Sequence, residues 1–339
     1  MSRHLIVALV LLSGCGDVGK PFQYPADGEL HFNQVQVLAT HNSYHVEMDG
    51  NTVPDWHYSE PPLDVQLDEE GVRSLELDIN WEGNSHFEVY HITAADELSN
   101  CKIFVDCLKT IAGWSARYPG HLPIYVQMEP KSGFRGLAPE DYFAALEREI
   151  LSVWPREQIL TPVDLQGSAP TLRDAVKANG WPTLGALRGK ILFGFDNTDT
   201  VRAAYTHNLA DLNGRMIFVD SRPDDPFAAI AIINDPKGGA ADITAALQAN
   251  LLVRTMSDPD LMTIKSGDTS LREAAIASGA QFVSTDYPVP TSEVAYSVTI
   301  PGGTPARCNP ITAPASCTSL AVENPSYVGS GKVLLSLQQ

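Results

Sequence analysis

The sequence lacks several features that would place it in a simple class. It has no apolar run of the roughly 20 residues that a membrane-spanning helix needs, and no internal repeat or low-complexity tract. Positive charge is scarce, since 23 lysines and arginines stand against 41 aspartates and glutamates and leave a formal net charge of −18. Nucleic acid and anionic membrane surfaces repel such a chain. We therefore expect no nucleic-acid partner and, for an anionic substrate, a bound cation at the site.

The amino-terminal residues have the pattern of an export signal. Arg3 precedes the apolar run Leu5–Leu12, which is too short to span a bilayer. Cys15 follows this run closely, in a pattern similar to the cleavage site of bacterial lipoproteins. We expect a signal peptide over residues 1–14, a lipid-anchored Cys15 and an exported protein of the cell envelope. Cleavage nearby and free secretion is the alternative.

Cysteine is also scarce, and the four cysteines after Cys15 form two close pairs, Cys101 with Cys107 and Cys308 with Cys317. An even number of cysteines in an exported protein indicates disulfides, and we expect both pairs to be linked locally. Six positions along one helix would hold the two Cα atoms about 9 Å apart, beyond disulfide reach. Cys101 should therefore lie in a loop before a helix that carries Cys107. A zinc site is the weaker alternative, because neither pair has the Cys-x2-Cys form and no histidine is close.

Short β-rich runs alternate with helical stretches, which is typical of βα units around a parallel sheet. Eight barrel strands are expected, at residues 35–39, 74–79, 123–128, 190–195, 215–219, 230–233, 251–254 and 281–284. An additional strand is expected at 87–92, and helices at 104–117, 139–153, 171–178, 240–249 and 270–277. Eight such units predict an α/β fold, a TIM-like barrel.

The same pattern sets the domain organisation. A linker would cover residues 15–32, and the barrel would fill residues 33–290. Residues 291–339 are rich in Pro, Gly, Ser and Thr and show no helical period, so we expect an irregular tail that packs on the barrel and is held by the second cysteine pair.

Polar side chains gather at the ends of the first three expected barrel strands. Asn42 follows the first strand, Glu76 and Asp78 end the second, and Glu129 follows the third. Active sites of α/β barrels lie at these carboxyl ends, and residues two apart on a strand point to one side. Neighbouring buried carboxylates are costly unless a cation neutralises them. An all-oxygen set of these four residues suits calcium, and magnesium less well.

Each of these motifs also has an ordinary structural interpretation. Glu-x-Asp is a common exposed strand pattern, and an asparagine after a strand is often a turn residue. Glu129 with Lys131 could form a surface ion pair of little energetic value. Their joint placement at three successive strand ends is what favours a site.

Two histidines complete the candidate site, His41 beside Asn42 and His91 in the additional strand. Imidazoles titrate near neutral pH and could serve as general base and general acid. Alternation with Val89 gives His91 a second interpretation, a half-buried histidine bonded to the backbone. The other histidines, including His45, show no further polar signal, and we treat them as incidental.

Five segments resemble, in order and spacing, successive motifs of the bacterial calcium-dependent phosphoinositide phospholipase C family. They are Thr40–Tyr44, Leu75–Asp78, Val89–His91, Val126–Lys131 and Gln281–Tyr287, and the likeness spans roughly residues 33–310. The resemblance implies an enzyme that cleaves phosphatidylinositol-type lipids at a membrane surface to diacylglycerol and a cyclic inositol phosphate. We expect it to act as a monomer.

The resemblance also implies roles for single residues. His41 would assist attack by the inositol 2-hydroxyl on phosphorus, and His91 would protonate the departing diacylglycerol oxygen. The calcium ligands would be Asn42, Glu76, Asp78 and Glu129, and the contacts to phosphate or headgroup would be Lys131, Arg254 and Tyr287.

Two other functions stay open at this point. A glycerophosphodiester phosphodiesterase shares the barrel, the metal and two histidines, but usually begins with His-Arg where this chain has His41-Asn42. A non-catalytic surface lipoprotein that binds headgroups would be favoured by the loss of a histidine or a ligand, and none is lost.

Overall fold

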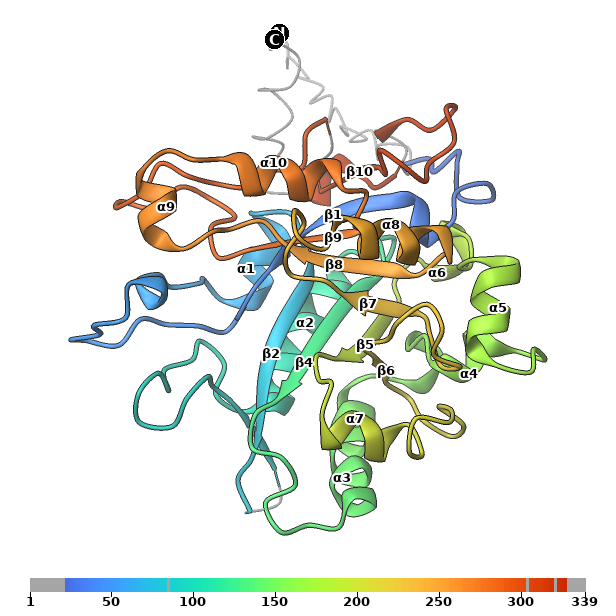
Figure 1. Ribbon diagram of the computed structural model, residues 1–339, viewed down its shortest axis with the longest axis horizontal. Coiled ribbons are helices and arrows are strands. Elements are labelled where there is room, and N and C mark those ends of the chain that lie inside the picture. Colours follow the sequence, from blue (N-terminus) through green and yellow to red (C-terminus); the bar gives the residue numbers. More distant parts are fainter. Residues whose placement is uncertain (1–21, 84–85, 303–304, 320–321, 328–339) are drawn as a thin grey trace, which may run out of the picture.

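The computed structural model describes residues 22–83, 86–302, 305–319 and 322–327 (Figure 1). The expected signal peptide over residues 1–14 and the lipidation site Cys15 lie outside the described residues. Within the described part of the chain, no helix is both long enough and apolar enough to cross a membrane.

Eight parallel strands form a nearly closed barrel, as the sequence pattern predicts (Figure 1). Around the barrel these are β6 (Phe218–Val219), β5 (Ile191–Phe195), β4 (Ile124–Pro130), β2 (Val72–Trp81), β1 (Val35–Thr40), β9 (Phe282–Thr285), β8 (Leu252–Met256) and β7 (Ile230–Ile232). An isolated parallel bridge between Asp220 and Ile230 joins the end of β6 to β7 and closes the ring. The last barrel strand, β9, therefore lies directly beside the first, β1.

Helices follow most of the strands and cover the barrel (Figure 1). They are α1 (Leu63–Asp68), α2 (Phe104–Arg117), α3 (Pro139–Val153), α4 (Pro162–Gln166), α5 (Leu172–Asn179), α6 (Leu184–Leu187), α7 (Thr200–Tyr205), α8 (Ala240–Gln248), α9 (Leu261–Lys265) and α10 (Ser270–Ala277). Short 3-10 turns lie at η1 (Phe32–Gln34), η2 (Pro54–Trp56), η3 (Arg156–Gln158) and η5 (Pro325–Tyr327). The five predicted helices are confirmed as α2, α3, α5, α8 and α10.

Helix α2 shows why these segments were recognisable. Phe104, Leu108 and Ile111 recur at helical spacing and are buried against the barrel, whereas Asp106 and Lys109 face outward. Such a stripe is the mark of a helix packed on one face. The additional helices α1, α4, α6, α7 and α9 have only four to six residues each, which is too short for the stripe to repeat.

The barrel interior is filled below its open end. All ten residues of β2 are buried. Tyr125 of β4 crosses the interior and stacks on Phe282 of β9, with 4.7 Å between ring centroids. A Cβ at Gly194 would lie 2.5 Å from the Tyr125 hydroxyl oxygen, so only glycine lets this ring occupy the core.

Two elements differ from the sequence-based expectations. Strand β3 covers Phe87–Val89 and pairs antiparallel with β2 only as far as Val89, so the expected strand at 87–92 is too long and His91 lies in the turn after it. The alternation of His91 with Val89 is therefore wrong. The tail contains a short strand, β10 (Ala306–Cys308), which pairs antiparallel with the first half of β1, where β1 has a free edge.

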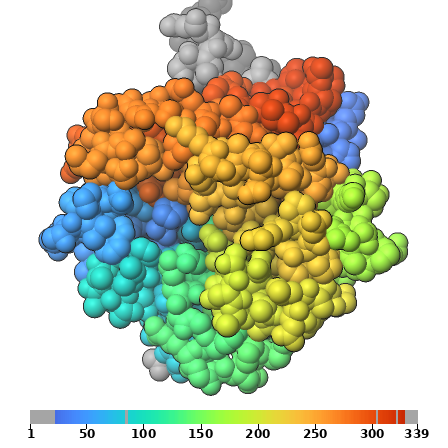
Figure 2. Space-filling model, viewed as in Figure 1, coloured from blue at the N-terminus to red at the C-terminus, as the bar shows by residue number. Residues whose placement is uncertain are grey.

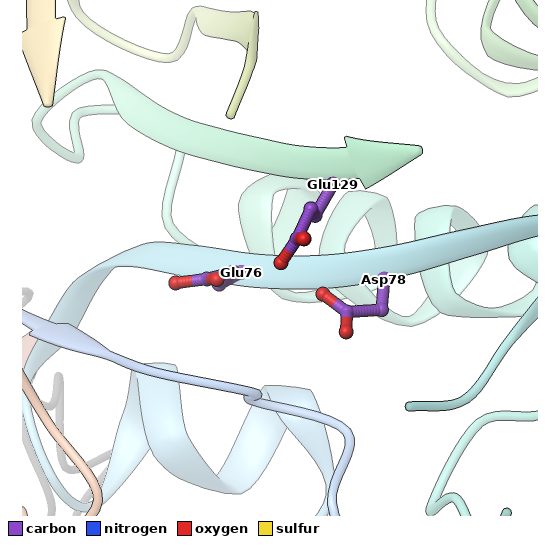
Figure 3. Close-up of side chains that lie close together, drawn as sticks. All are labelled: Glu76, Asp78 and Glu129. Atoms are coloured by element: carbon purple, nitrogen blue, oxygen red, sulfur yellow. The ribbon is translucent and has the colours of Figure 1, made fainter. Parts of the chain in front are cut away.

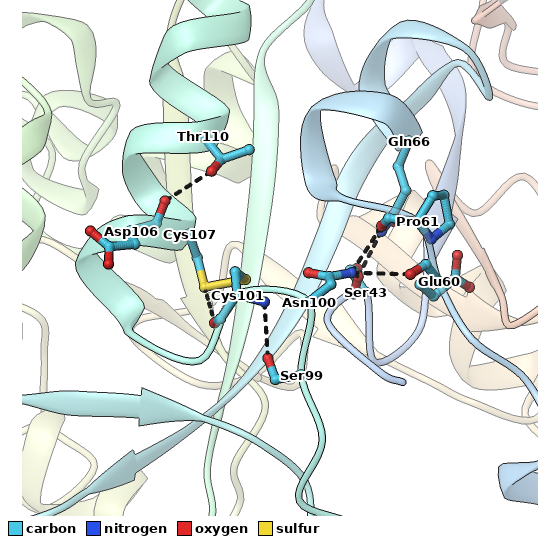
Figure 4. The surroundings of a disulfide bond; sticks show 10 residues. All are labelled: Ser43, Glu60, Pro61, Gln66, Ser99, Asn100, Cys101, Asp106, Cys107 and Thr110. Carbon is cyan, nitrogen blue, oxygen red and sulfur yellow. Dashed lines mark hydrogen bonds between the residues drawn. A yellow bond between two sulfur atoms is a disulfide. The ribbon is translucent and has the colours of Figure 1, made fainter. Parts of the chain in front are cut away.

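Both predicted disulfides are present, Cys101 with Cys107 and Cys308 with Cys317. Cys101 lies in the loop before α2, which carries Cys107, as the spacing required (Figure 4). The residue before the first bridge, Asn100, donates its side-chain amide to the backbone oxygens of Ser43 at 3.1 Å and Pro61 at 2.8 Å. Asn100, next to the first disulfide, therefore fastens the loop that follows β1.

Candidate metal centre and active site

Three carboxylates meet at the carboxyl ends of β2 and β4. Glu76, Asp78 and Glu129 each offer an oxygen, and these oxygens lie within 4.8 Å of one another. Asp78 and Glu129 are direct register partners on the two strands. Glu129 reaches from β4 into the space between Glu76 and Asp78 (Figure 3). The surface is hollowed near the centre of the face in view, where blue, green, yellow and orange segments meet (Figure 2).

Asp78 shows most directly that this cluster suits a cation. Its side chain is 0 % exposed, and its one ion-pair partner among the described residues is the ammonium of Lys131. Burial raises the pKa of Asp78 well above its usual value; Lys131 opposes this, and the charges of Glu129 and Glu76 add to it. A buried carboxylate that faces two further carboxylates and has a single cationic partner belongs to the kind of oxygen donor set that a hard divalent cation prefers.

Two basic side chains balance part of this charge. The Nζ of Lys131 lies 3.1 Å from an oxygen of Asp78 and 2.9 Å from an oxygen of Glu129. Across the barrel, Arg254 of β8 lies 2.5 Å from an oxygen of Glu76 and also donates to the side chain of Asn234. Two of the three predicted headgroup contacts, Lys131 and Arg254, are thus held at the carboxylates, and Arg254 is buried.

Asn42, the predicted fourth ligand, follows β1 in a left-handed backbone conformation with φ of 43°. Asparagine adopts this conformation more readily than most residues. Its neighbour Ser43 donates its N–H to the backbone oxygen of Glu76 at 3.0 Å, and the Ser43 hydroxyl accepts the N–H of Glu76 at 2.8 Å. The loop is thereby fixed beside Glu76, while the Asn42 side-chain oxygen accepts a hydrogen bond from Tyr44.

His41 is paired with an aspartate that sequence reasoning did not assign. Its Nδ1 lies 2.8 Å from Asp286, and its side chain is 32 % exposed. Burial lowers the pKa of His41, but the charges of Asp286 and Glu76 and the hydrogen bond to Asp286 prevail and raise it to about 9. Thr40 and Thr285 are register partners on β1 and β9, so the residues that follow them meet. A carboxylate directly after the last barrel strand was the signal for this pair.

His91 lies in the turn after β3 and is 17 % exposed. Its Nδ1 is 2.9 Å from Asp96, and the rings of His91 and Trp56 form a T-shaped pair with 5.4 Å between centroids. The hydrogen bond thus goes to a carboxylate, and not to the backbone as the structural interpretation had it. Burial lowers the pKa of His91, against the hydrogen bond and charge of Asp96.

Tyr287, the remaining predicted contact, is buried beside Asp286. Its ring packs against Tyr58 and Tyr296. It also lines a small cavity of about 220 Å³ with several acidic residues, among them Asp258 and Asp286. The structure therefore places Tyr287 behind the His41 pair, with almost all of its ring covered.

Two further carboxylates lie at strand ends. Asp196 follows β5 and accepts a hydrogen bond from Gln127 at 2.9 Å. Burial, together with the charge of Glu76, raises the pKa of Asp196 to about 7, and burial raises that of Asp220, after β6, to about 6. Acidic groups thus lie at the carboxyl ends of β2, β4, β5, β6 and β9, and the sequence analysis did not assign Asp196, Asp220 or Asp286.

Comparisons with known proteins identify a family and a fold. A family model described as "Phosphoinositide phospholipase C, Ca2+-dependent" matches residues 30–86 and 82–310. No curated protein sequence matches the chain.

Several solved structures are similar in fold. One is the calcium-dependent phosphoinositol-specific phospholipase C of a Pseudomonas species, with 21 % identity, a TM-score of 0.60, and coverage of 84 % of this chain and 97 % of that chain. The corresponding enzyme of Streptomyces antibioticus has 20 % identity and a TM-score of 0.57, over 76 % and 95 %. The phosphatidylinositol-specific phospholipase C of S. aureus has 14 % identity and a TM-score of 0.51, over 81 % and 92 %. Because the family model matches most of its length, the chain belongs to the Ca2+-dependent phosphoinositide phospholipase C family.

Proposed function

We propose that this phosphodiesterase cleaves phosphatidylinositol-type lipids to diacylglycerol and a cyclic inositol phosphate, with His41 as general base and His91 as general acid. The observation that carries the proposal is the cluster of Glu76, Asp78 and Glu129 in the barrel mouth. Each histidine has its Nδ1 tied to a carboxylate, which leaves Nε2 for the reaction. The family match supports the phosphoinositide substrate.

The three carboxylates, with the side-chain oxygen of Asn42, would hold a calcium ion. When bound, calcium supplies a Lewis acid that stabilises negative charge on the phosphate oxygens. Lys131 now neutralises Asp78 and Glu129. A cation at these carboxylates would take over that task and leave the Lys131 ammonium available to a phosphate oxygen.

In the proposed reaction the inositol 2-hydroxyl oxygen forms a bond to phosphorus and the bond from phosphorus to the diacylglycerol oxygen breaks. The proton of the 2-hydroxyl passes to Nε2 of His41, and Nε2 of His91 gives a proton to the departing oxygen. Asp286 accepts the Nδ1–H of His41 and stabilises the positive ring that forms. Opening of the cyclic product by water would use the same two groups in exchanged roles.

The charges around His41 affect its readiness as a base. A base must be neutral, and in the protein alone the pKa of His41 is raised to about 9. Part of that rise comes from Glu76, a proposed ligand. A divalent cation beside Glu76 opposes this contribution, so the pKa of His41 should fall when the site is loaded.

The remaining carboxylates of the mouth favour a hydroxyl-rich headgroup. Asp196 and Asp220 can accept hydrogen bonds from hydroxyls, and they repel additional phosphate groups. Substrates whose headgroup is a hydroxylated, otherwise uncharged ring should therefore suit Asp196 and Asp220 better than glycerophosphodiesters with a small alcohol as headgroup.

The proposal is tested by following the products with phosphorus NMR. Phosphatidylinositol should give a cyclic phosphate in calcium and none in excess chelator, and a lipid whose inositol 2-hydroxyl is methylated should stay intact. Glycerophosphocholine should be a poor substrate. Cleavage of the methylated lipid at the normal rate, or a preference for glycerophosphocholine, would favour attack by water and the glycerophosphodiester alternative.

The two disulfides should differ in their effect on this activity. Replacing Cys101 and Cys107 by serine should lower the turnover of phosphatidylinositol, because Asn100 next to the bridge holds Ser43 in the loop of His41 and Asn42. The same change at the tail bridge, Cys308 with Cys317, is the matched control and should affect thermal stability more than turnover. Turnover assays at a temperature well below both unfolding midpoints separate the effects. Equal turnover of the two double variants would contradict the proposed link.

A further inference from the structure

A single buried carboxylate connects two histidines of this site. Asp96 lies in the loop between β3 and α2 and is 2 % exposed. One of its oxygens is 2.9 Å from Nδ1 of His91, and the other is 2.9 Å from Nε2 of His45. The backbone N–H of each of Asp96 and Ile92 donates to the backbone oxygen of the other, at 2.8 Å each. These two hydrogen bonds close a turn that places the Asp96 carboxylate beside His91.

His45 comes from a different loop, the one that carries His41 and Asn42 after β1. It is 1 % exposed and stacks on Tyr58 with 4.4 Å between ring centroids. Its Nδ1 is buried and has no hydrogen-bond partner among the described residues. A proton on Nδ1 would be a buried donor without an acceptor, whereas a hydrogen on Nε2 is donated to Asp96, and this arrangement favours the Nε2–H form of the ring.

We propose that Asp96 and His45 are positioning residues for the reaction proposed above, on which this inference rests. Asp96 accepts the Nδ1–H of His91 and so turns Nε2 of that ring toward the leaving oxygen. His45 holds the second oxygen of Asp96, which fixes the plane of the carboxylate and ties the loop of the general acid to the loop of the general base.

The charges around His91 give Asp96 a second task. Lys131 from the end of β4 and His41 from the end of β1 both disfavour a positive charge on His91, whereas Asp96 favours it. A general acid must hold its proton before it can give it away, so the negative charge on Asp96 supports the acid form of His91.

The first test is Asp96→Asn, assayed on two substrates. Asparagine is neutral and has one accepting oxygen, so it can accept the N–H of only one of the two histidines. Cleavage of phosphatidylinositol should fall about 10²-fold, within the range of positioned proton transfer. An inositol phosphate ester of nitrophenol needs little protonation of its leaving group and should lose less than about tenfold. Glu97→Gln, one position along the same loop, is the charge-matched control and should leave both rates near those of the unchanged protein.

The second test compares two variants of His45. His45→Phe keeps a ring against Tyr58 but removes the hydrogen bond to Asp96, whereas His45→Gln retains a side-chain N–H. The phenylalanine variant should show the same selective loss on phosphatidylinositol, and the glutamine variant should recover most of it. Similar rates for these two variants would contradict the role of His45.

A readout without turnover separates this inference from the proposed function. Nitrogen-15 NMR of the imidazole rings should find His91 protonated on Nδ1 in the unchanged protein, with a lower pKa in Asp96→Asn. If the unchanged protein fails to cleave phosphatidylinositol, the proposed function is wrong, and the NMR result still decides the inference. Equal losses of Asp96→Asn on both substrates, or an unchanged tautomer and pKa of His91, would overturn it. If Asp96→Asn does not fold, the His45 pair and the tautomer in the unchanged protein give the answer.

Discussion

His91→Ala is expected to slow the cleavage of phosphatidylinositol by about 10²–10⁴-fold, which is the usual value of positioned proton transfer. The alkoxide of diacylglycerol is a poor leaving group and needs the proton that His91 would supply. Nitrophenolate departs without one. The same variant should therefore keep much of its activity on an inositol phosphate ester of nitrophenol, measured by absorbance in parallel with the lipid assay.

His41→Ala is the matched comparison, because attack and charge stabilisation come before any difference between leaving groups. It should lose activity on both substrates alike. Equal losses on both substrates for His91→Ala would show that this residue does not act as the general acid. The half-buried histidine bonded to Asp96 would then be a structural residue.

Asp78→Asn is expected to remove calcium-supported turnover. Residues that only support the ligands of a metal site are worth about 10–100-fold in metal affinity or activity. The loss of a direct ligand should have a larger effect. The substitution keeps the shape of the side chain and removes its charge from the three-carboxylate cluster. Chelation of the unchanged protein should have the same effect, and calcium should restore activity better than magnesium or zinc. Glu82→Gln, on a partly exposed carboxylate paired with Arg135, is the control and should remain active. Full activity in excess chelator would be incompatible with the proposed site.

Much of the fold followed from short-range patterns in the sequence. The stripe of α2 and the buried runs of β1 and β2 repeat over enough residues to be recognised. Glu76 and Asp78 could be placed on one side of a strand because the side-chain period of a strand is two. Glu129 joined them because β4 lies parallel to β2, with Glu129 opposite Asp78.

The missing parts of the site depend on contacts between segments far apart in the chain. Asp286 meets His41 only because barrel closure places β9 beside β1. Arg254 reaches Glu76 from β8, which is separated from β2 by two strands around the barrel. Asp286 can be recognised as a carboxylate after a barrel strand, but the partners of Asp286 and Arg254 depend on which strands become neighbours.

The loop after β3 also contains contacts that the sequence did not predict, although the residues lie close together in the chain. The strand stops at Val89 because pairing with β2 ends there, and the chain turns back to bring Asp96 onto His91. His45 directly follows the Thr40–Tyr44 motif, but the sequence does not show that it meets the second oxygen of Asp96. The conformations of two loops bring Asp96 to His91 and His45, and side-chain periodicity does not predict loop conformation.

The central claim is that Glu76, Asp78 and Glu129 bind calcium in the barrel mouth, and a calorimetric titration with calcium tests it most directly. The unchanged protein should bind one calcium ion, and Glu76→Gln and Asp78→Asn should bind it far more weakly while unfolding at a similar temperature. Unchanged calcium affinity in both variants, or no binding heat and no calcium-dependent shift in the unfolding temperature of the unchanged protein, would contradict the account.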